Sequence, residues 1–124
     1  MQQLKDEVSS KDLSKQVVEG MLEKKALDVV VMDLRKVKHA IADYFIICSG
    51  NSDTQIEAIS DSIEEQVHKF SKQNPWRREG RENKEWILLD YVDVVAHIFN
   101  KEKREFFGLE ELWGDAKIEK ISEN

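Results

Sequence analysis

Hydrophobic residues at helical spacing occur near both ends of the chain. Close to the amino terminus an apolar residue recurs every fourth position, which predicts a helix over residues 11–25. Close to the carboxyl terminus a shorter stripe predicts a second, short helix. The residues of the two stripes are Leu13, Val17 and Met21, followed by Phe106, Leu109, Leu112 and Trp113.

The longest helical pattern lies in the middle of the chain. Apolar residues between Ile56 and Phe70 are separated by three or four positions, as on one face of a helix. Ser52 and Gln55 fit a capping box, in which side chains accept hydrogen bonds from backbone N–H groups of the first turn, and Asn74-Pro75 ends the helix. A helix of this length can connect two parallel strands, so we expect the next strand to lie parallel to the strand before the helix.

Strand patterns surround this helix. Runs rich in β-branched and aromatic residues predict strands over residues 26–34 and 44–49, which we expect to pair antiparallel. Two more runs, 86–90 and 94–99, are separated only by Tyr91-Val92-Asp93 and predict a hairpin. The polar segment between the helix and the hairpin predicts a loop that contains a short edge strand. The predicted fold class is therefore α/β, a single domain with a mixed β-sheet flanked by helices.

The charge balance favours a protein partner. The 124 residues include 25 acidic and 19 basic side chains, a formal net charge of −6. Nucleic-acid surfaces are normally basic, so this balance argues against an extended RNA surface. It favours a basic protein, because opposite fields raise encounter rates. No apolar run reaches the length that spans a bilayer, and the first residues lack a signal-peptide pattern. We therefore expect a cytoplasmic protein without a membrane partner.

The acidic residues do not fit metal-dependent nucleotidyl transfer, the enzyme class that competes with a binding protein here. That reaction needs two carboxylates on one strand face, which means a spacing of two, and no two acidic residues are two apart. Asp90 and Asp93 instead bracket the predicted turn, where carboxylates accept hydrogen bonds from turn N–H groups. The histidines lack a metal-ligand spacing, and Cys48 lies in a buried strand. The sequence therefore predicts no catalytic residue, cofactor or metal.

Aromatic residues are the remaining candidates for binding. Trp76-Arg77-Arg78 and Arg81 can stack on RNA, although neighbouring acids dilute the charge and a solvated loop is the commoner outcome. Trp86 opens a strand, where one ring face can be exposed, and Trp and Tyr are enriched as interface anchors. The alternative is that these aromatic residues cap the core. The sequence leaves the two interpretations open.

Three segments resemble the ribosomal silencing factor (Iojap) family in order and spacing, and the resemblance extends over roughly residues 13–116. They are the strand and turn ADYFIICSGNS at 42–52; Pro75, Glu79-Gly80 and then WILLDYVDVVAHIF at 86–99; and the closing helix REFFGLEELWGDA at 104–116. On this basis we expect an N-terminal extension over residues 1–12, a ribosomal silencing factor domain over residues 13–116 and a mobile tail over residues 117–124.

The resemblance implies a nucleotidyltransferase-like fold without the catalytic acids, in agreement with the missing acid pair. It implies a translation repressor that binds the large ribosomal subunit through ribosomal protein number fourteen, with little direct RNA contact. By occupying that face the repressor blocks joining with the small subunit when nutrients are limiting. A homodimer away from the ribosome is one of the states that the sequence leaves open. Carried over residue by residue, the partner-binding surface comprises Trp86, Asp90, Tyr91, Asp93 and His97.

One position in the hairpin departs from the family pattern. The family usually has glycine between the Tyr-like residue and the second aspartate, where this chain has Val92. A β-branched side chain disfavours positive φ, so we expect the turn to be shaped differently here.

Overall fold

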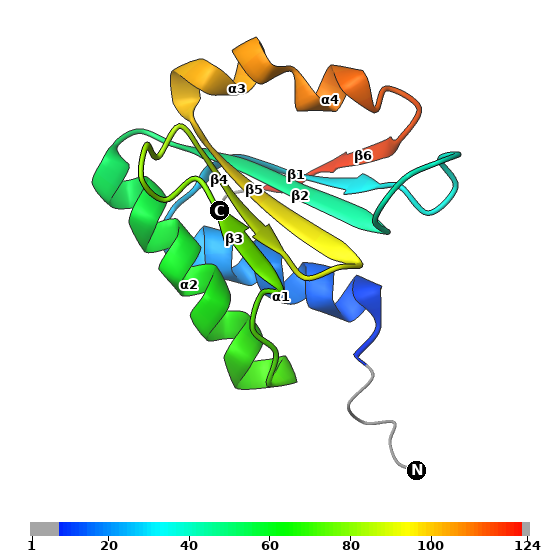
Figure 1. The fold of residues 1–124 in the computed structure, drawn as a ribbon, viewed down its shortest axis with the longest axis horizontal. Helices are drawn as coiled ribbons and strands as arrows, with labels where there is room; N and C mark the ends of the chain where they lie inside the picture. Colours follow the sequence, from blue (N-terminus) through cyan, green and yellow to red (C-terminus); the bar gives the residue numbers. More distant parts are fainter. Residues whose placement is uncertain (1–7, 123–124) are drawn as a thin grey trace.

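The computed structural model describes residues 8–122, which form one six-stranded sheet between two helical layers (Figure 1). Residues 1–7 of the predicted extension and 123–124 of the predicted tail lie outside the described residues. The helices are α1 (Ser10–Glu23), α2 (Asp53–Ser71), α3 (Lys101–Phe107) and α4 (Leu109–Leu112). The strands are β1 (Leu27–Asp33), β2 (Tyr44–Gly50), β3 (Arg77–Glu79), β4 (Trp86–Asp90), β5 (Val94–Asn100) and β6 (Lys117–Lys120).

The sheet is mixed, as the sequence predicted. Its strand order is β3-β4-β5-β2-β1-β6. β2 and β5 pair parallel, and the other neighbours pair antiparallel. The sequence predicted that the strand after α2 lies parallel to β2; that strand, β3, runs in the same direction as β2 but does not pair with it. The chain first forms the edge strand β3 and then β4, and only β5 returns beside β2, because the tight turn after β4 holds β4 and β5 together.

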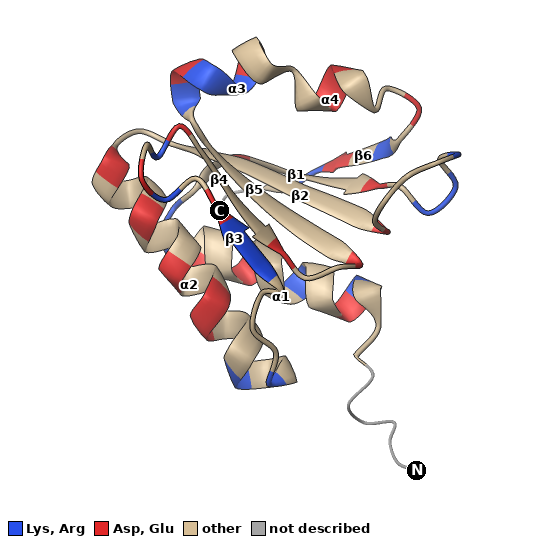
Figure 2. Cartoon of the chain, in the orientation of Figure 1, with Lys and Arg blue, Asp and Glu red and all other residues tan. Residues whose placement is uncertain are grey.

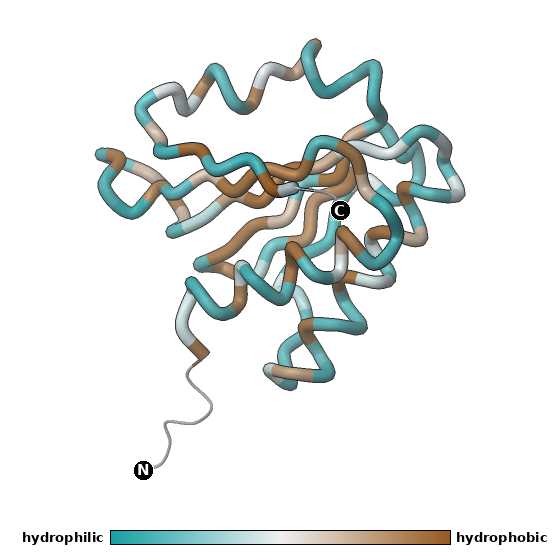
Figure 3. The backbone as a smooth tube through the Cα atoms, turned by 180° about the vertical axis from the view of Figure 1, so that it is seen from behind, coloured by the Kyte–Doolittle hydropathy of each residue, from teal (hydrophilic) through white to brown (hydrophobic). Residues whose placement is uncertain are grey.

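Helices α1 and α2 cover one face of the sheet, which we call the inner face. Both helices begin at the kind of serine cap that the sequence predicted for α2: Ser52 Oγ accepts a hydrogen bond from the Gln55 N–H, 3.1 Å away. A Cβ added at Gly20 of α1 would lie 2.7 Å from Ile63 Cα of α2, so only glycine allows this close approach. Figure 3 shows that the hydrophobic residues concentrate in the strands between the layers.

The opposite face, which we call the outer face, has a thinner cover made of α3, α4 and the β1–β2 loop. Leu109 and Trp113 pack on this face, but Phe106 and Leu112 are 78% and 73% exposed. The single helical stripe predicted from these four residues was therefore wrong. Gly108 takes a left-handed conformation with φ +58 and divides the segment into two short helices with different orientations.

The end of the chain also differs from its prediction. Residues 117–120, which were predicted to belong to a mobile tail, form β6 and pair antiparallel with β1. The four residues are exposed and have no apolar pattern, so hydropathy does not reveal the strand. Its stabilisation comes from main-chain hydrogen bonds to the edge of β1, including one from the Ile121 N–H to the Val29 carbonyl.

Candidate functional site

Strand β4 places two of the predicted interface residues, Trp86 and Asp90, on the outer face together with Leu88 between them. Residues 87 and 89 of this strand are fully buried on the inner face, whereas Trp86, Leu88 and Asp90 alternate with them and are half-buried. The cover formed by α3 and α4 reaches Trp86 but leaves this strip partly open. We call Trp86, Leu88 and Asp90 the β4 strip.

Trp86 is fixed by contacts on three sides. Its indole Nε1–H donates a hydrogen bond to Nδ1 of His97, 3.0 Å away. Its ring stacks on Phe99 with the centroids 4.9 Å apart and contacts Phe107 of α3 at 4.8 Å. Since the only polar atom of the indole is used internally, the exposed part of Trp86 presents carbon atoms. A partner at this place therefore meets an apolar, preoriented ring.

His97 lies below the β4 strip and supports it. Its side chain is 2% exposed and packs edge-on against Phe45 at 4.6 Å. Burial lowers its pKa to about 3, so the imidazole is neutral at physiological pH. Because Nδ1 accepts the bond from Trp86, the proton is on Nε2, and Nε2 is buried without a hydrogen-bond partner. The resemblance assigned His97 to the partner-binding surface, but its side chain is buried and reaches that surface only through its hydrogen bond to Trp86.

The hairpin turn adopts the conformation that glycine favours, although a valine occupies it. Val92 has φ +78 and its side chain is 58% exposed. Its N–H donates to Asp90 Oδ1 at 2.8 Å, and the Asp93 N–H donates to the Tyr91 carbonyl at 3.0 Å. These bonds hold a tight turn with a strained central residue. The prediction that Asp90 accepts from a turn N–H group is confirmed.

The five predicted interface residues do not all lie on one surface. Trp86 and Asp90 share the outer face, with His97 beneath them, and Asp93 is exposed in the turn. Asp90 is also 3.4 Å from the Arg77 guanidinium, so part of its charge is neutralised internally. Tyr91, which the resemblance assigned to the partner-binding surface, matches the alternative that the aromatic residues cap the core. Tyr91 is 5% exposed and belongs to the inner-face core, because one further residue along the strand reverses the side-chain direction.

Two arginines of the predicted basic cluster, Arg78 and Arg81, are committed to ion pairs with α2, and Arg77 pairs with Glu79 and Asp90. Arg78 donates two hydrogen bonds of 2.7 Å to Glu64, and Arg81 contacts two further carboxylates of α2 at 3.1 and 3.2 Å. Figure 2 shows these acidic residues along α2 in red beside the blue strand β3. The pairs attach the edge of the sheet to α2 and remove free positive charge from the cluster. Trp76, by contrast, is 73% exposed.

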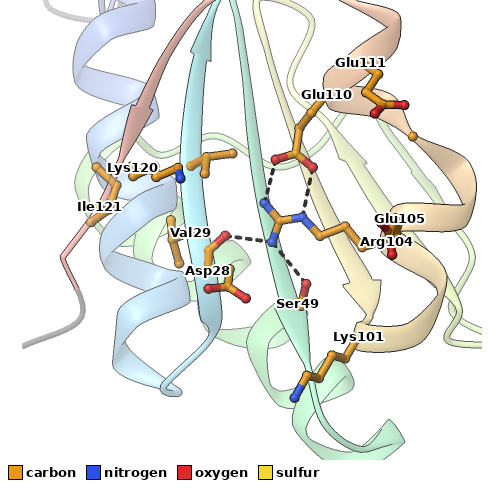
Figure 4. Close-up of a pocket in the computed structure, with 12 residues that line it drawn as sticks. Asp28, Val29, Ser49, Lys101, Arg104, Glu105, Glu110, Glu111, Lys120 and Ile121 are labelled. Atoms are coloured by element: carbon orange, nitrogen blue, oxygen red, sulfur yellow. Dashed lines mark hydrogen bonds and ion pairs between the residues drawn. The ribbon is translucent and has the colours of Figure 1, made fainter.

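A polar hollow under α3 contains another fully committed arginine (Figure 4). Arg104 forms two hydrogen bonds with Glu110, at 3.1 and 3.0 Å. Its Nη1 donates to the carbonyl oxygen of Asp28 and to Ser49 Oγ, at 2.7 and 3.1 Å. Arg104 therefore attaches the outer helical layer to β1 and β2, and its guanidinium has no free donor fork for an anion.

Among residues 8–122 no group of three or more His, Cys, Asp or Glu side chains could hold a metal ion. Cys48 is fully buried, and burial raises the pKa of its thiol well above the ordinary value, as expected of an inert cysteine. In the part of the chain that the structure describes, no helix is long and apolar enough to cross a membrane.

The sequence profile of the family described as "Ribosomal silencing factor during starvation" matches residues 7–124. The chain belongs to this family. The ribosomal silencing factor RsfS of Bacillus subtilis is 41% identical over 96 residues, which are 77% of this chain and 80% of that protein. The family's members carry the names of regulators rather than enzymes, in agreement with the prediction from the acidic residues.

A solved structure and a distant relative extend the comparison. A crystal structure of a protein from Chromobacterium violaceum has a TM-score of 0.81 and 27% sequence identity, covering 86% of this chain and 88% of that one. A mouse protein named "Mitochondrial assembly of ribosomal large subunit protein 1" is 32% identical over 73 residues, which are 57% of this chain and 32% of that protein.

The sequence did not lead us to predict the hydrogen bond between Trp86 and His97. The signal was present in the register of the hairpin. Counting back from the turn pairs Trp86 with Phe99 and Leu88 with His97, as observed. Trp86 and His97 are then diagonal neighbours on one face, within reach of a long side chain. The distance between them still depends on the side-chain rotamers, which the register does not specify.

Proposed function

We propose that this protein represses translation in the cytoplasm by binding the large ribosomal subunit through ribosomal protein number fourteen. In this proposal it occupies the face that meets the small subunit and prevents the two from joining when nutrients are limiting. The protein acts by steric exclusion, so it needs a stable binding surface and no reactive group.

Membership of the ribosomal silencing factor family is the observation that carries this proposal. The family's description refers to silencing of the ribosome during starvation. The name of the mouse relative refers to the large ribosomal subunit, which supports that subunit as the binding partner. Both names describe the relatives, and their extension to this chain rests on the match over most of its length.

We propose the β4 strip and the adjoining turn as the contact surface. Trp86 supplies a large ring whose orientation is set before binding, so little side-chain entropy is lost when a partner docks. Leu88 adds a half-buried apolar neighbour, and Asp93 places an exposed carboxylate at the end of the strip. A basic ribosomal protein with an apolar patch would match this arrangement. His97 and Tyr91 then act from below, by holding Trp86 and the turn in place.

The test is co-sedimentation of the purified protein with separated large and small subunits, followed by a joining assay. We expect the protein to sediment with large subunits and to reduce the yield of joined ribosomes in proportion to its occupancy. Isolated ribosomal protein number fourteen should bind the protein directly. The proposal fails if the protein sediments only with small subunits, or if saturated large subunits join small subunits at the normal rate.

A further inference from the structure

The corner where α2 ends and β3 begins carries two exposed aromatic side chains. Phe70 is 56% exposed and Trp76 is 73% exposed. A cation lies over each ring: Lys69 Nζ is 5.4 Å from the Phe70 centroid, and the Arg77 guanidinium carbon is 5.8 Å from the Trp76 centroid. Exposed apolar surface of this kind marks binding sites when it is clustered. We call Lys69, Phe70, Lys72 and Trp76 the α2–β3 corner.

The charge of this corner is opposite to that of the whole chain. The protein has a net charge of −6, yet residues 66–78 form the longest stretch of the sequence without Asp or Glu. Lys69 and Lys72 are both exposed in this stretch. Neither lysine forms an ion pair with another described residue. Figure 2 shows blue at this end of α2, away from its red stripe.

Backbone and side-chain bonds hold the corner in place. The helix ends at Lys72, which has a left-handed conformation and donates its N–H to the His68 carbonyl at 3.0 Å. Ser71 Oγ donates to Gln16 of α1 at 2.6 Å, and the Trp76 N–H donates to the Asp90 carbonyl at 2.7 Å. Since the segment is anchored at both ends, little entropy is lost when a ligand binds to it.

We propose that the α2–β3 corner binds an unpaired segment of ribosomal RNA. Exposed rings with neighbouring cations are the combination that single-stranded nucleic acid recognises, because bases stack on the rings and phosphates lie beside the cations. Trp76 and Phe70 stack on bases, and Lys69 and Lys72 contact phosphates. The site is confined to one corner. The protein, although acidic as a whole and bound mainly to a ribosomal protein, therefore makes one local contact with RNA. This inference rests on the proposed function, because the ribosome supplies the RNA.

The chain contains a matched control for this corner. On α3, Phe106 is 78% exposed and Lys103 Nζ lies 5.5 Å from its centroid. The chemistry of that pair is the same, but Glu102 and Glu105 flank it in the sequence. Phe106→Ala therefore removes one exposed aromatic ring, and Lys101→Gln with Lys103→Gln removes two positive charges, at a place where we expect no RNA.

The first measurement is ultraviolet crosslinking of the wild-type protein bound to large subunits, followed by nuclease and trypsin digestion. We expect a nucleotide adduct on the peptide that contains Trp76. The second is the affinity for large subunits as a function of salt. Trp76→Ala should weaken binding about tenfold. Lys69→Gln with Lys72→Gln should make the slope of log affinity against log salt shallower by about 1.4. Both control variants should match the wild type.

The outcomes separate this inference from the proposed function. Normal binding by Trp76→Ala and no nucleotide adduct would overturn the RNA site while the proposed function stands. A crosslink from Trp76 to a protein would assign the corner to an acidic protein and also overturn the RNA site. If the wild type does not bind large subunits, the proposed function fails. The RNA site is then tested separately, by measuring binding of the protein to oligouridine at about 50 mM salt. Oligouridine binding by the wild type that is lost in Trp76→Ala supports the RNA site. Absence of oligouridine binding by the wild type overturns it.

Discussion

The two faces of the sheet differ in how completely helices cover them and in the side chains that they bury. The inner face lies under two long helices, and its core consists mostly of aliphatic residues, together with Tyr44 and Tyr91. The outer face lies under two short helices, and its core contains aromatic rings, a neutral histidine with an unpaired nitrogen, and a half-buried tryptophan. A fully covered face contributes mainly stability. An incompletely covered face keeps apolar surface available, at some cost in stability, for a partner to bury.

In strand β4, two neighbouring residues show the difference between the inner and the outer face. Ile87 is fully buried under the helices of the inner face, and Trp86, one position earlier, points to the outer face. Substitutions at the two positions change the same strand at nearly the same place. Any difference in their effects therefore reports on the face rather than on the strand.

Ile87→Ala should have the largest effect, and only on stability. We expect the free energy of unfolding to fall by about 3 kcal/mol, because the change leaves a cavity in a fully packed core. Denaturant unfolding followed by circular dichroism measures this change. The folded fraction should still bind large subunits within about twofold of the wild type, since an energy change below 0.4 kcal/mol is expected for a side chain that touches no partner. A cost below 1 kcal/mol would contradict the assignment of the inner face as the main stabilising face.

Trp86→Ala should chiefly affect binding. We expect the affinity for large subunits to fall by about 2 kcal/mol, roughly thirtyfold, as for an aromatic interface anchor. Because Trp86 also contacts Phe99 and Phe107, circular dichroism and thermal melting must show that the variant is folded at the temperature of the binding assay. Ile87→Ala is the control for a general loss of stability. Equal binding by folded Trp86→Ala and the wild type would move the contact surface away from the β4 strip.

His97 should make the outer face sensitive to acid. Its pKa is about 3 in the folded state, below the unfolded value of about 6.5, so the unfolded chain takes up a proton first as the pH falls. Stability is therefore unaffected above the unfolded pKa and is lost as the pH falls from there towards 3. Between pH 7 and pH 5, the free energy of unfolding of the wild type should fall by about 2 kcal/mol more than that of His97→Gln.

Glutamine keeps an acceptor for the Trp86 N–H and removes the titrating group, so it isolates the effect of the proton. Denaturant titrations at the two pH values provide the measurement. Parallel losses in the wild type and the variant would show that the imidazole is protonated without unfolding, and that the outer face admits water.

Val92→Gly should have the smallest effect and the opposite sign. Val92 has φ +78, which costs a β-branched residue more than it costs glycine. We expect the free energy of unfolding to rise by about 1 kcal/mol, reduced by the greater freedom of glycine in the unfolded chain. Val92→Ala is the control, because alanine keeps a Cβ and should gain much less. A lower melting temperature for Val92→Gly would show that the turn is unstrained or that the valine side chain stabilises it.

Local patterns predicted the elements that depend on local physics. The apolar spacing of 56–70 and the cap at Ser52 predicted α2 because a helix satisfies its own hydrogen bonds and shows one face to the core. The hairpin followed from the three residues between two strand patterns, and the absence of paired acids followed from the spacing of the acidic residues. The burial of Tyr91 also follows from local physics, because strand alternation counted from Trp86 places its side chain on the inner face.

The amino-acid sequence by itself determined which side chains of each helix and strand face together, because that periodicity belongs to the element. The tertiary structure alone decided which of those faces are covered by other elements and which remain exposed. β6 forms because the edge of β1 offers unpaired main-chain groups, and its own residues carry no strand pattern. Arg78 and Arg81 lost their free charge because α2 packs beside β3, whereas Trp76 and Trp86 kept exposed surface because no helix covers them completely. Exposure depends on contacts between residues that are distant in sequence, so the local pattern of apolar residues does not determine it.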